Sequence, residues 1–183
     1  MLNRRIDDDI ELRLLELLHA PELFARIHAC RSHLRQWLLW VDQTQDVADT
    51  EAFINDAVEQ FANGEALHMG IWWRGVLAGV IGYHRIDPQN RVGEIGYWLG
   101  DVFQGRGIMT KACLAMVDYG FTERGLNRIE IHCAPANGKS RAIPERLGFQ
   151  IEGTLRQAER LAEGYVDNVV YGLLASEYAD TAR

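Results

Sequence analysis

The sequence predicts a mixed α/β fold, in which one twisted sheet carries helices on both of its faces. Most of the strand patterns follow one another through tight turns, and strands joined in this way run antiparallel. One strand pattern is instead followed by a helix and another strand, the connection that makes two strands parallel neighbours. We therefore expect a central sheet that is mostly antiparallel and contains one parallel crossover.

The length and composition fit a single domain that spans residues 1–183. Hydrophobic residues make up 48% of the chain and charged residues 25%, which is the balance of a globular protein. Lysine and arginine number 19 against 26 aspartates and glutamates, so the formal net charge is −7. Because phosphate backbones attract clustered cations, this acidic chain is not expected to bind nucleic acid directly. A cationic partner, such as an amine or a basic protein tail, suits its charge better.

The sequence lacks the usual signals for secretion, membrane insertion and metal binding. The N-terminal segment does not have the pattern of a secretory signal, and no apolar run approaches the ~18–20 residues of a membrane helix. Cys30, Cys113 and Cys133 are odd in number and far apart, which indicates reduced thiols. His28 and His33 are five residues apart and do not share a helical face. We therefore expect a cytoplasmic protein with no membrane anchor and no metal.

The N-terminal third predicts one strand and two helices. Ile10–Leu14 alternates apolar and polar residues, the pattern of a half-buried strand. Pro21 lies at the start of one helical pattern, and a second pattern over Asp49–Ala62 ends at Asn63-Gly64. The expected apolar faces consist of Leu23, Ile27 and Cys30 in the first helix and of Ala52, Phe53, Ala57 and Phe61 in the second.

Strand patterns dominate the rest of the chain. Leu67–Trp73 and Val76–Tyr83 are joined by Arg74-Gly75, a pair that favours a tight hairpin. The remaining expected elements are, in chain order, the strand Val92–Leu99, the helix Ile108–Thr122, the strand Arg128–Cys133, a short helix over Ser140–Leu147, and two closing strands over Gln150–Leu155 and Tyr165–Ala175.

The turn between the strand Val92–Leu99 and the next helix carries the main chemical signal. Gly105 and Gly107 have no side chains, so the backbone N–H groups of this turn can approach a ligand closely. The first helical turn leaves its own N–H groups unpaired at the positive end of the helix dipole. With the charges of Arg106 and Lys111, these donors favour a pyrophosphate. A plain tight turn is the alternative, and the spacing matches neither the dinucleotide nor the P-loop fingerprint.

Residues 104–110, QGRGIMT, resemble the Q/R-x-x-G-x-G/A signature of the GCN5-related N-acetyltransferases (GNAT), which wraps the pyrophosphate of acetyl-CoA. Met109 stands where most of the family has Gly or Ala, a variant typical of the branch of ribosomal-protein serine and alanine N-terminal acetyltransferases. The resemblance implies the GNAT acyl-CoA N-acyltransferase fold, with acetyl-CoA as co-substrate. Other segments similar to that branch, spread over nearly the whole chain, are Arg35–Trp40, Gly96–Leu99, Asn137–Ser140, Arg146–Phe149 and Ile151–Glu159.

The resemblance also implies which residues hold acetyl-CoA. The backbone of Tyr97 and Leu99, on the strand before the turn, is expected to pair with pantetheine or with the developing oxyanion. Asn137 is expected to bond the pantetheine arm or to cap the following helix. The residues expected around the pyrophosphate are Gln104, Gly105, Arg106, Gly107, Ile108, Met109 and Thr110.

Two residues carry the catalytic chemistry that the resemblance implies. Glu159 matches the glutamate that takes a proton from the amine; a solvated surface carboxylate is the alternative. Ser140 matches the serine that protonates or hydrogen-bonds the departing thiolate, and serine is also a good helix N-cap. Pro144 departs from the family pattern, and we expect it either to delay the start of the helix or to distort the first turn around Ser140.

Four further residues are expected near the acceptor amine. Trp37 and Trp40 are placed three apart on a helix, where they either wall the acceptor groove or pack in the core. Tyr165 and Asp167 are placed in a glycine-bounded loop before the last strand, a region that flanks the acceptor site in the branch.

The sequence therefore predicts an enzyme that transfers acetyl directly from acetyl-CoA to a primary amine, namely the α-amine of a ribosomal protein. Direct transfer is expected because no activated nucleophile is evident. Two alternatives remain open: an enzyme that acetylates a polyamine or another small amine, and a regulatory module that binds acyl-CoA without turnover. Since relatives in the branch are often dimers, a homodimer is expected.

Overall fold

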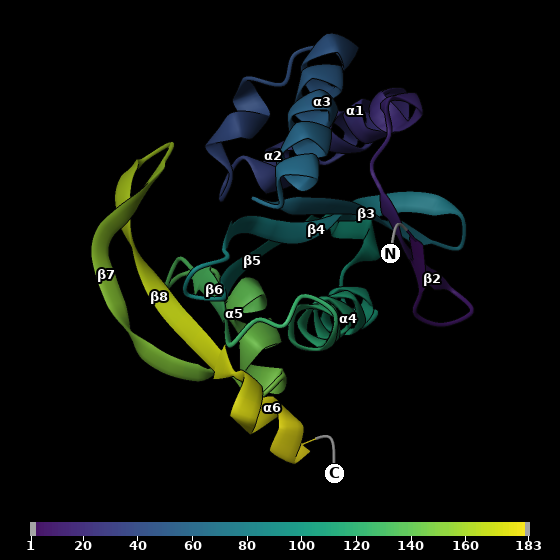
Figure 1. Ribbon diagram of the computed structural model, residues 1–183. Helices are drawn as coiled ribbons and strands as arrows, with labels where there is room; N and C mark the ends of the chain where they lie inside the picture. The colour runs from purple at the N-terminus through teal and green to yellow at the C-terminus, as the bar shows by residue number, and fades with distance from the viewer. Residues whose placement is uncertain (1–2, 182–183) are drawn as a thin grey trace.

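A computed structural model describes residues 3–181 and shows one sheet with helices on both faces (Figure 1). The strands are β1 (Asn3–Arg5), β2 (Ile10–Leu14), β3 (Leu67–Trp73), β4 (Val76–Asp87), β5 (Val92–Leu99), β6 (Arg128–Cys133), β7 (Gln150–Leu161) and β8 (Gly164–Leu174). They form a sheet of order β1-β2-β3-β4-β5-β6-β8-β7, in which only the β5–β6 pair is parallel among the described residues. The expected mixed sheet with one parallel crossover is confirmed.

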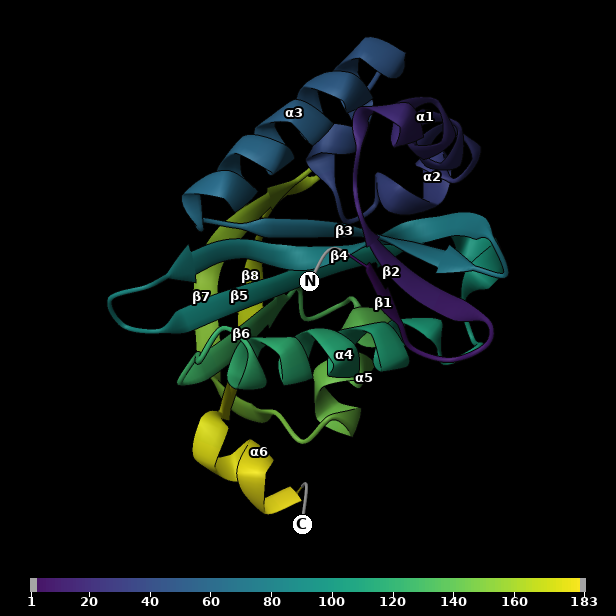
Figure 2. The same cartoon turned by 45° about the vertical axis from the view of Figure 1, so that its right-hand side comes forward.

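The helices divide between the two faces of this sheet (Figure 2). In chain order they are α1 (Ala20–Ala29), α2 (Arg31–Leu34), α3 (Val47–Asn63), α4 (Ile108–Thr122), α5 (Gly138–Arg146) and α6 (Ala175–Thr181). Three short 3-10 helices are η1 (Leu17–His19), η2 (Leu39–Asp42) and η3 (Asp101–Phe103). The first three α-helices cover one face, while α4 and α5 lie against the other.

Each face has its own hydrophobic core. The core on the α4 side includes Ile81, Ile95 and Met116, and the core on the α1–α3 side includes Leu23 and Ile54. Alternation along the strands feeds both cores, because successive side chains of a strand point to opposite faces. Each strand in the middle of the sheet therefore contributes side chains to both hydrophobic cores.

The buried face of α3 differs from the expected one. Ala52 and Phe53 are exposed, whereas Thr50, Ile54 and Ala57 are buried. The Thr50 hydroxyl donates to the Ala20 carbonyl oxygen at 3.0 Å, so a polar residue occupies the inward stripe. Apolar periodicity alone could not identify this stripe, because its first member is a threonine satisfied by a bond to another helix.

The closing hairpin is longer than expected. β7 continues to Leu161, six residues beyond its expected end, and β8 begins at Gly164. Tyr165 and Asp167 therefore lie within the last strand, as the expected bounds Tyr165–Ala175 imply, and the expectation of a loop before that strand is wrong. A bulge between Leu155 and Glu159 interrupts the apolar–polar alternation, and this is why the strand pattern appeared to end early.

Close strand contact at Gly82 makes a testable stability prediction. A Cβ atom at Gly82 would lie 2.0 Å from the Leu67 carbonyl oxygen, so Gly82→Ala is expected to lower the free energy of unfolding by about 1–3 kcal/mol. Gly153→Ala is the matched control, since no atom lies within 4 Å of its added Cβ. Urea unfolding measures both variants, and equal stability of the two would contradict the prediction.

Candidate active site

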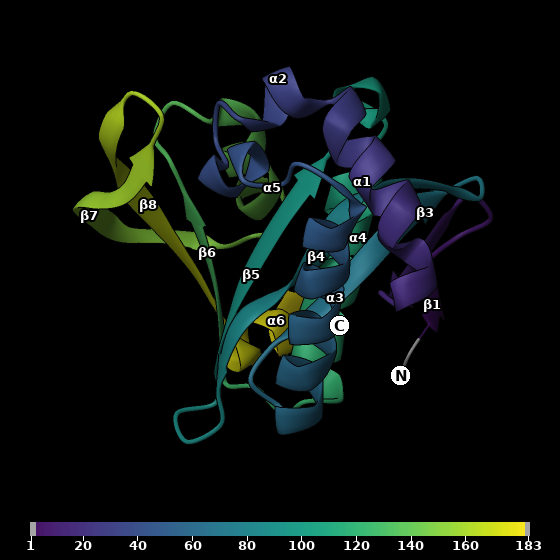
Figure 3. The ribbon, with the colours of Figure 1, turned by 90° about the horizontal axis from the view of Figure 1, so that it is seen from above.

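The strands β5 and β6 pair over only part of their length and then diverge. Their parallel pairing joins Val92–Glu94 to Arg128–Glu130, but β5 continues to Leu99 and β6 to Cys133. Figure 3 shows the two strands diverging from their paired ends. Backbone N–H and C=O groups that leave a ladder need other partners. The gap therefore offers strand-like hydrogen bonds to an extended ligand beside Tyr97 and Leu99.

The glycine turn closes the end of this gap. Gly105 and Gly107 both have φ +73°, a left-handed conformation that glycine adopts without strain. A Cβ on either residue would meet nothing within 4 Å, so it is the backbone conformation and not crowding that requires glycine here. No side chain caps the N-terminus of α4, and no acidic residue lies in its first turn. The N–H groups of this turn are therefore able to bind an anionic ligand.

The charges near the turn differ from those that the sequence suggests. Lys111 is paired with Asp7 at 2.6 Å, and the Arg106 guanidinium lies over the Trp73 ring at 5.0 Å. A different cation approaches the turn, because Lys139 of α5 donates to the Gln104 side-chain oxygen at 2.8 Å. The other end of the Gln104 amide lies 2.7 Å from His33 Nε2.

Ser140 is fixed by contacts from three directions. Its backbone N–H donates to the Asn137 side chain at 3.2 Å, which makes Asn137 the N-cap of α5. Its hydroxyl oxygen lies 3.2 Å from the Cys133 Sγ on β6. Its carbonyl oxygen accepts from the Tyr97 hydroxyl on β5 at 2.9 Å. Side chains from both separated strands therefore meet at Ser140. Burial raises the pKa of the Tyr97 phenol and of the Cys133 thiol, so both are neutral donors or acceptors near pH 7.

Pro144 explains the Tyr97 contact. In a regular helix the N–H of residue 144 would donate to the Ser140 carbonyl, but proline has no N–H to give. The Tyr97 hydroxyl occupies the freed carbonyl oxygen instead. The helix starts at Gly138, before Ser140, so the expected delay of the helix start is wrong. The proline leaves Ser140 in the first turn and links α5 to β5.

A second prediction concerns the hydrogen bond from Tyr97 to the Ser140 carbonyl oxygen. Tyr97→Phe leaves that oxygen without its donor and should lower the free energy of unfolding by about 1–2 kcal/mol. In a Pro144→Ala background the restored N–H can donate to the same oxygen, so Tyr97→Phe should cost less there. A double-mutant cycle by urea unfolding measures this coupling. An identical cost in both backgrounds would refute the role of Pro144.

Glu159 lies on β7 on the same side of the sheet as Glu94 and His132. The Asn168 amide of β8, oriented so that its nitrogen is the donor, lies 3.0 Å from Glu159 Oε2. Burial raises the pKa of Glu159, the Asn168 bond opposes this, and the Glu94 charge adds to the rise. The side chain is half-buried, which disfavours the alternative of a solvated surface carboxylate.

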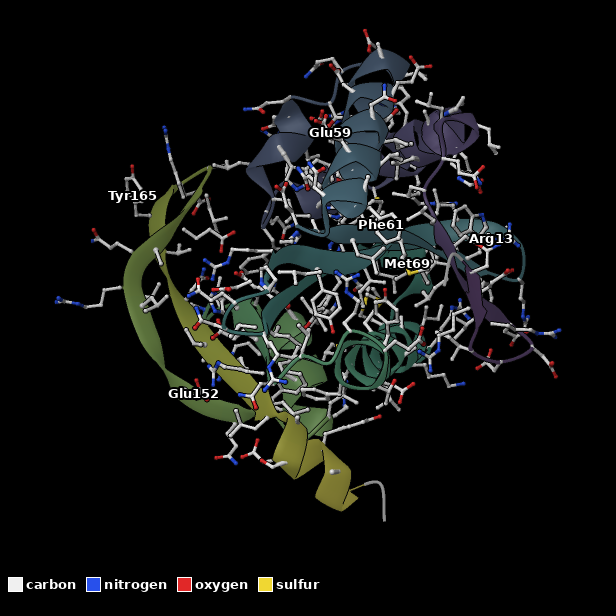
Figure 4. All side chains as sticks on the ribbon, viewed as in Figure 1. Arg13, Glu59, Phe61, Met69, Glu152 and Tyr165 are labelled. Carbon is white, nitrogen blue, oxygen red and sulfur yellow. The ribbon has the colours of Figure 1, made fainter. Side chains whose placement is uncertain are left out.

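The expected acceptor residues divide into two groups. Trp40 in η2 packs against Trp98 of β5, with ring centroids 6.2 Å apart, and remains 37% exposed. Trp37 lies in the turn after α2, so the two tryptophans do not share a helix as expected. Tyr165 is 65% exposed near the tip of the β7–β8 hairpin (Figure 4). The carboxylate of Asp167 accepts from the Gln157 N–H at 2.8 Å.

Two histidines that the sequence did not single out lie on the face of the sheet covered by α1–α3. The rings of His68 and His84 are 5.8 Å apart, and burial lowers the pKa of His68 to about 4. Burial also lowers the pKa of His84, so both rings are neutral near pH 7. A Cβ on Gly96 would lie 1.5 Å from His84 Nε2, so the glycine of the Gly96–Leu99 segment makes room for this ring. The proximity of Gly96 and His84 follows from the register of β4 and β5 and could not be predicted from the sequence.

The geometry fits a particular class of protein. The site suits a ligand of coenzyme A type for two reasons. The separated strands can align an extended amide chain, and the N-terminus of α4 can hold linked phosphates. The half-buried carboxylate of Glu159, on the face of the sheet away from α4, suits removal of a proton from an amine. Within residues 3–181, no cluster of three or more potential metal ligands is present. None of the helices described there has the length and apolar character needed to cross a bilayer.

Comparisons with known proteins agree with this class. The acetyltransferase (GNAT) domain family matches residues 9–150. YdaF of Bacillus subtilis (strain 168), provisionally named a ribosomal N-acetyltransferase, is 38% identical over 180 residues, which are 97% of this chain and 98% of that protein. The ribosomal-protein-serine acetyltransferase of Escherichia coli (strain K12) is 33% identical over 167 residues, 91% of this chain and 93% of that one.

A solved structure extends the likeness to the ligand. The microcin C7 self-immunity acetyltransferase MccE, crystallised with acetyl-CoA and AMP, superposes with a TM-score of 0.88. The match has 32% sequence identity and covers 92% of this chain and 94% of that one. The chain therefore belongs to the GNAT family and is an N-acetyltransferase that uses acetyl-CoA.

Proposed function

We propose that the acceptor is the α-amine at the N-terminus of a ribosomal protein. The observation that carries this proposal is the likeness, over nearly the full length of both chains, to a ribosomal-protein-serine acetyltransferase. The acidic chain, with a net charge of −7, suits a basic protein as its partner. A cytoplasmic location and a homodimer, both expected from the sequence, are part of the same proposal.

Glu159 is the base in this proposal. An α-ammonium group, with a pKa near 8, must lose a proton before its nitrogen can attack a thioester. The raised pKa of Glu159 brings the carboxylate closer to the amine in basicity, while Asn168 keeps it oriented. The new N–C bond then forms as the thioester C–S bond breaks, and the proton taken from the nitrogen resides on Glu159.

Ser140 serves the leaving sulfur in this proposal. Its hydroxyl lies on the α5 side of the gap, beside Cys133, and its backbone is fixed by Asn137 and Tyr97. A serine hydroxyl is a weak acid, so its contribution is a hydrogen bond that stabilises the departing thiolate. The backbone N–H groups of residues 104–110 hold the pyrophosphate and align the thioester with the amine.

The pH dependence of turnover tests the base. Because Glu159 must be ionised, kcat/KM should fall as pH drops through a limb whose midpoint lies above the ordinary glutamate value of 4.5. Glu159→Gln should lower kcat by about a hundredfold or more and abolish this limb. Calorimetry should show that coenzyme A still binds this variant. Unchanged turnover in Glu159→Gln would remove the residue from its role.

The identity of the acceptor needs its own experiment. Release of free CoA thiol should be fastest with peptides that copy ribosomal protein N-termini, and slower by about tenfold or more with spermidine or small amines. Matched peptides with a blocked α-amine are the control. Faster turnover of spermidine would select a polyamine acetyltransferase. Bound acetyl-CoA without thiol release from any acceptor would instead indicate a regulatory binding module.

A further inference from the structure

The bulge in β7 changes where Glu159 meets β8. Leu155 pairs with Asn168, but Glu159 pairs with Val166, so residues 156–158 of β7 stand opposite the single residue Asp167. An uninterrupted ladder that continued from the Leu155 pair would place Glu159 opposite Gly164. The bulge thus moves Glu159 two residues along β8 toward Asn168, a displacement of about 7 Å.

This displacement decides whether the two side chains can touch. Residues four apart along a strand are about 13 Å apart, beyond the reach of a glutamate and an asparagine. Residues that are diagonal by two positions lie on the same face and within reach of each other. The observed 3.0 Å contact between Asn168 and Glu159 Oε2 therefore depends on the bulge.

Asp167 holds the bulge in place. Gln157, at the middle of the bulge, has φ +51°, a conformation that costs a residue with a side chain about 1 kcal/mol. The Asp167 carboxylate accepts from the Gln157 N–H at 2.8 Å, and the Asp167 carbonyl oxygen lies 3.3 Å from the Asn168 amide nitrogen. Asp167 thus supports the bulge through its side chain and orients Asn168 through its backbone.

We propose that Asp167 and Asn168 are positioning residues, which place the Glu159 carboxylate for proton transfer by fixing the β7 bulge and by donating one hydrogen bond. The inference rests on the proposed role of Glu159 as the base. It gives Asp167 a structural task that differs from the substrate contact expected from the sequence. Because both residues lie on the terminal hairpin and not at the β5–β6 gap, we expect their substitution to leave acetyl-CoA binding intact.

The charges around Glu159 make the proposal measurable. Glu94 of β5 and His132 of β6 act on Glu159 electrostatically, and Asn168 of β8 bonds it directly. His132 in turn lies between Glu94, at 3.5 Å, and Glu130, at 3.1 Å. These neighbours are unchanged by substitution at Asn168, so a shift in the acid limb of the pH profile reports the Asn168 contact itself.

The first test compares two substitutions at Asn168. Asn168→Asp places a second carboxylate about 3 Å from Glu159, and like charges at this distance raise the pKa of one of them, so the acid limb should move up by about one unit or more. Asn168→Ala removes the donor, and it should lower kcat by about tenfold with a smaller upward shift of the limb. Asn127→Asp, the same change at an exposed position in the bend just before β6, is the control and should shift nothing.

The second test separates positioning from charge. Asp167→Ala removes the acceptor for the Gln157 N–H, and kcat should fall by about tenfold while KM for acetyl-CoA stays the same. Asp167→Asn keeps an acceptor oxygen and should restore most of the turnover. Thermal unfolding of each variant identifies any that fail to fold, and the Asp167→Asn and Asn168→Asp pair then carries the test.

The outcomes distinguish this inference from the proposed function. If Glu159→Gln loses turnover while every Asn168 and Asp167 variant keeps the normal kcat and acid limb, the positioning role is overturned and the function stands. A wild-type acid limb that persists in Glu159→Gln overturns the base assignment itself. Equal losses in Asp167→Asn and Asp167→Ala would show that Asp167 acts through its charge and not through the bulge.

Discussion

The early end of the β5–β6 pairing is the constraint on which the site depends. Two strands that separate inside a sheet expose backbone groups that must be satisfied elsewhere, so the fold tolerates the gap only where a ligand or water can enter. Ser140 braces the gap because it contacts Tyr97 of β5 and Cys133 of β6 at once. The glycine turn follows β5, so phosphates bound there, as proposed, would align the rest of the ligand with the gap.

Strand alternation divides the side chains of β5 between the two faces of the sheet. On β5, Ile95 and Leu99 join the core beside α4, while Trp98 packs with the core beneath α1–α3. Glu94 on the second face lies near His132 and acts on Glu159. In the proposed reaction, the amine therefore approaches from the face that carries Glu94 and Glu159, while the β5 backbone beside the gap aligns the thioester.

Much of this architecture could be predicted from the sequence. The bounds of β5, α4 and β6 match the expected ones to the residue, and Gly100 and Gly107 mark the end of β5 and the start of α4. The turn at residues 104–110 was identifiable because glycine at φ +73° leaves a sequence signal. Asn137 was identifiable as an N-cap because a helix N-terminus selects few residue types, whereas Ser140, which is not the N-cap, was singled out through the family resemblance.

What only the tertiary structure decided are the relations between distant segments. The sequence specified Pro144 but not that its missing N–H leaves a carbonyl for Tyr97, a residue more than forty positions away. It specified Glu159 but not the bulge that brings this carboxylate to Asn168, since strand register depends on pairing energies summed over both strands. Local patterns fix local backbone geometry, whereas hydrogen bonds across the sheet select which side chains finally meet.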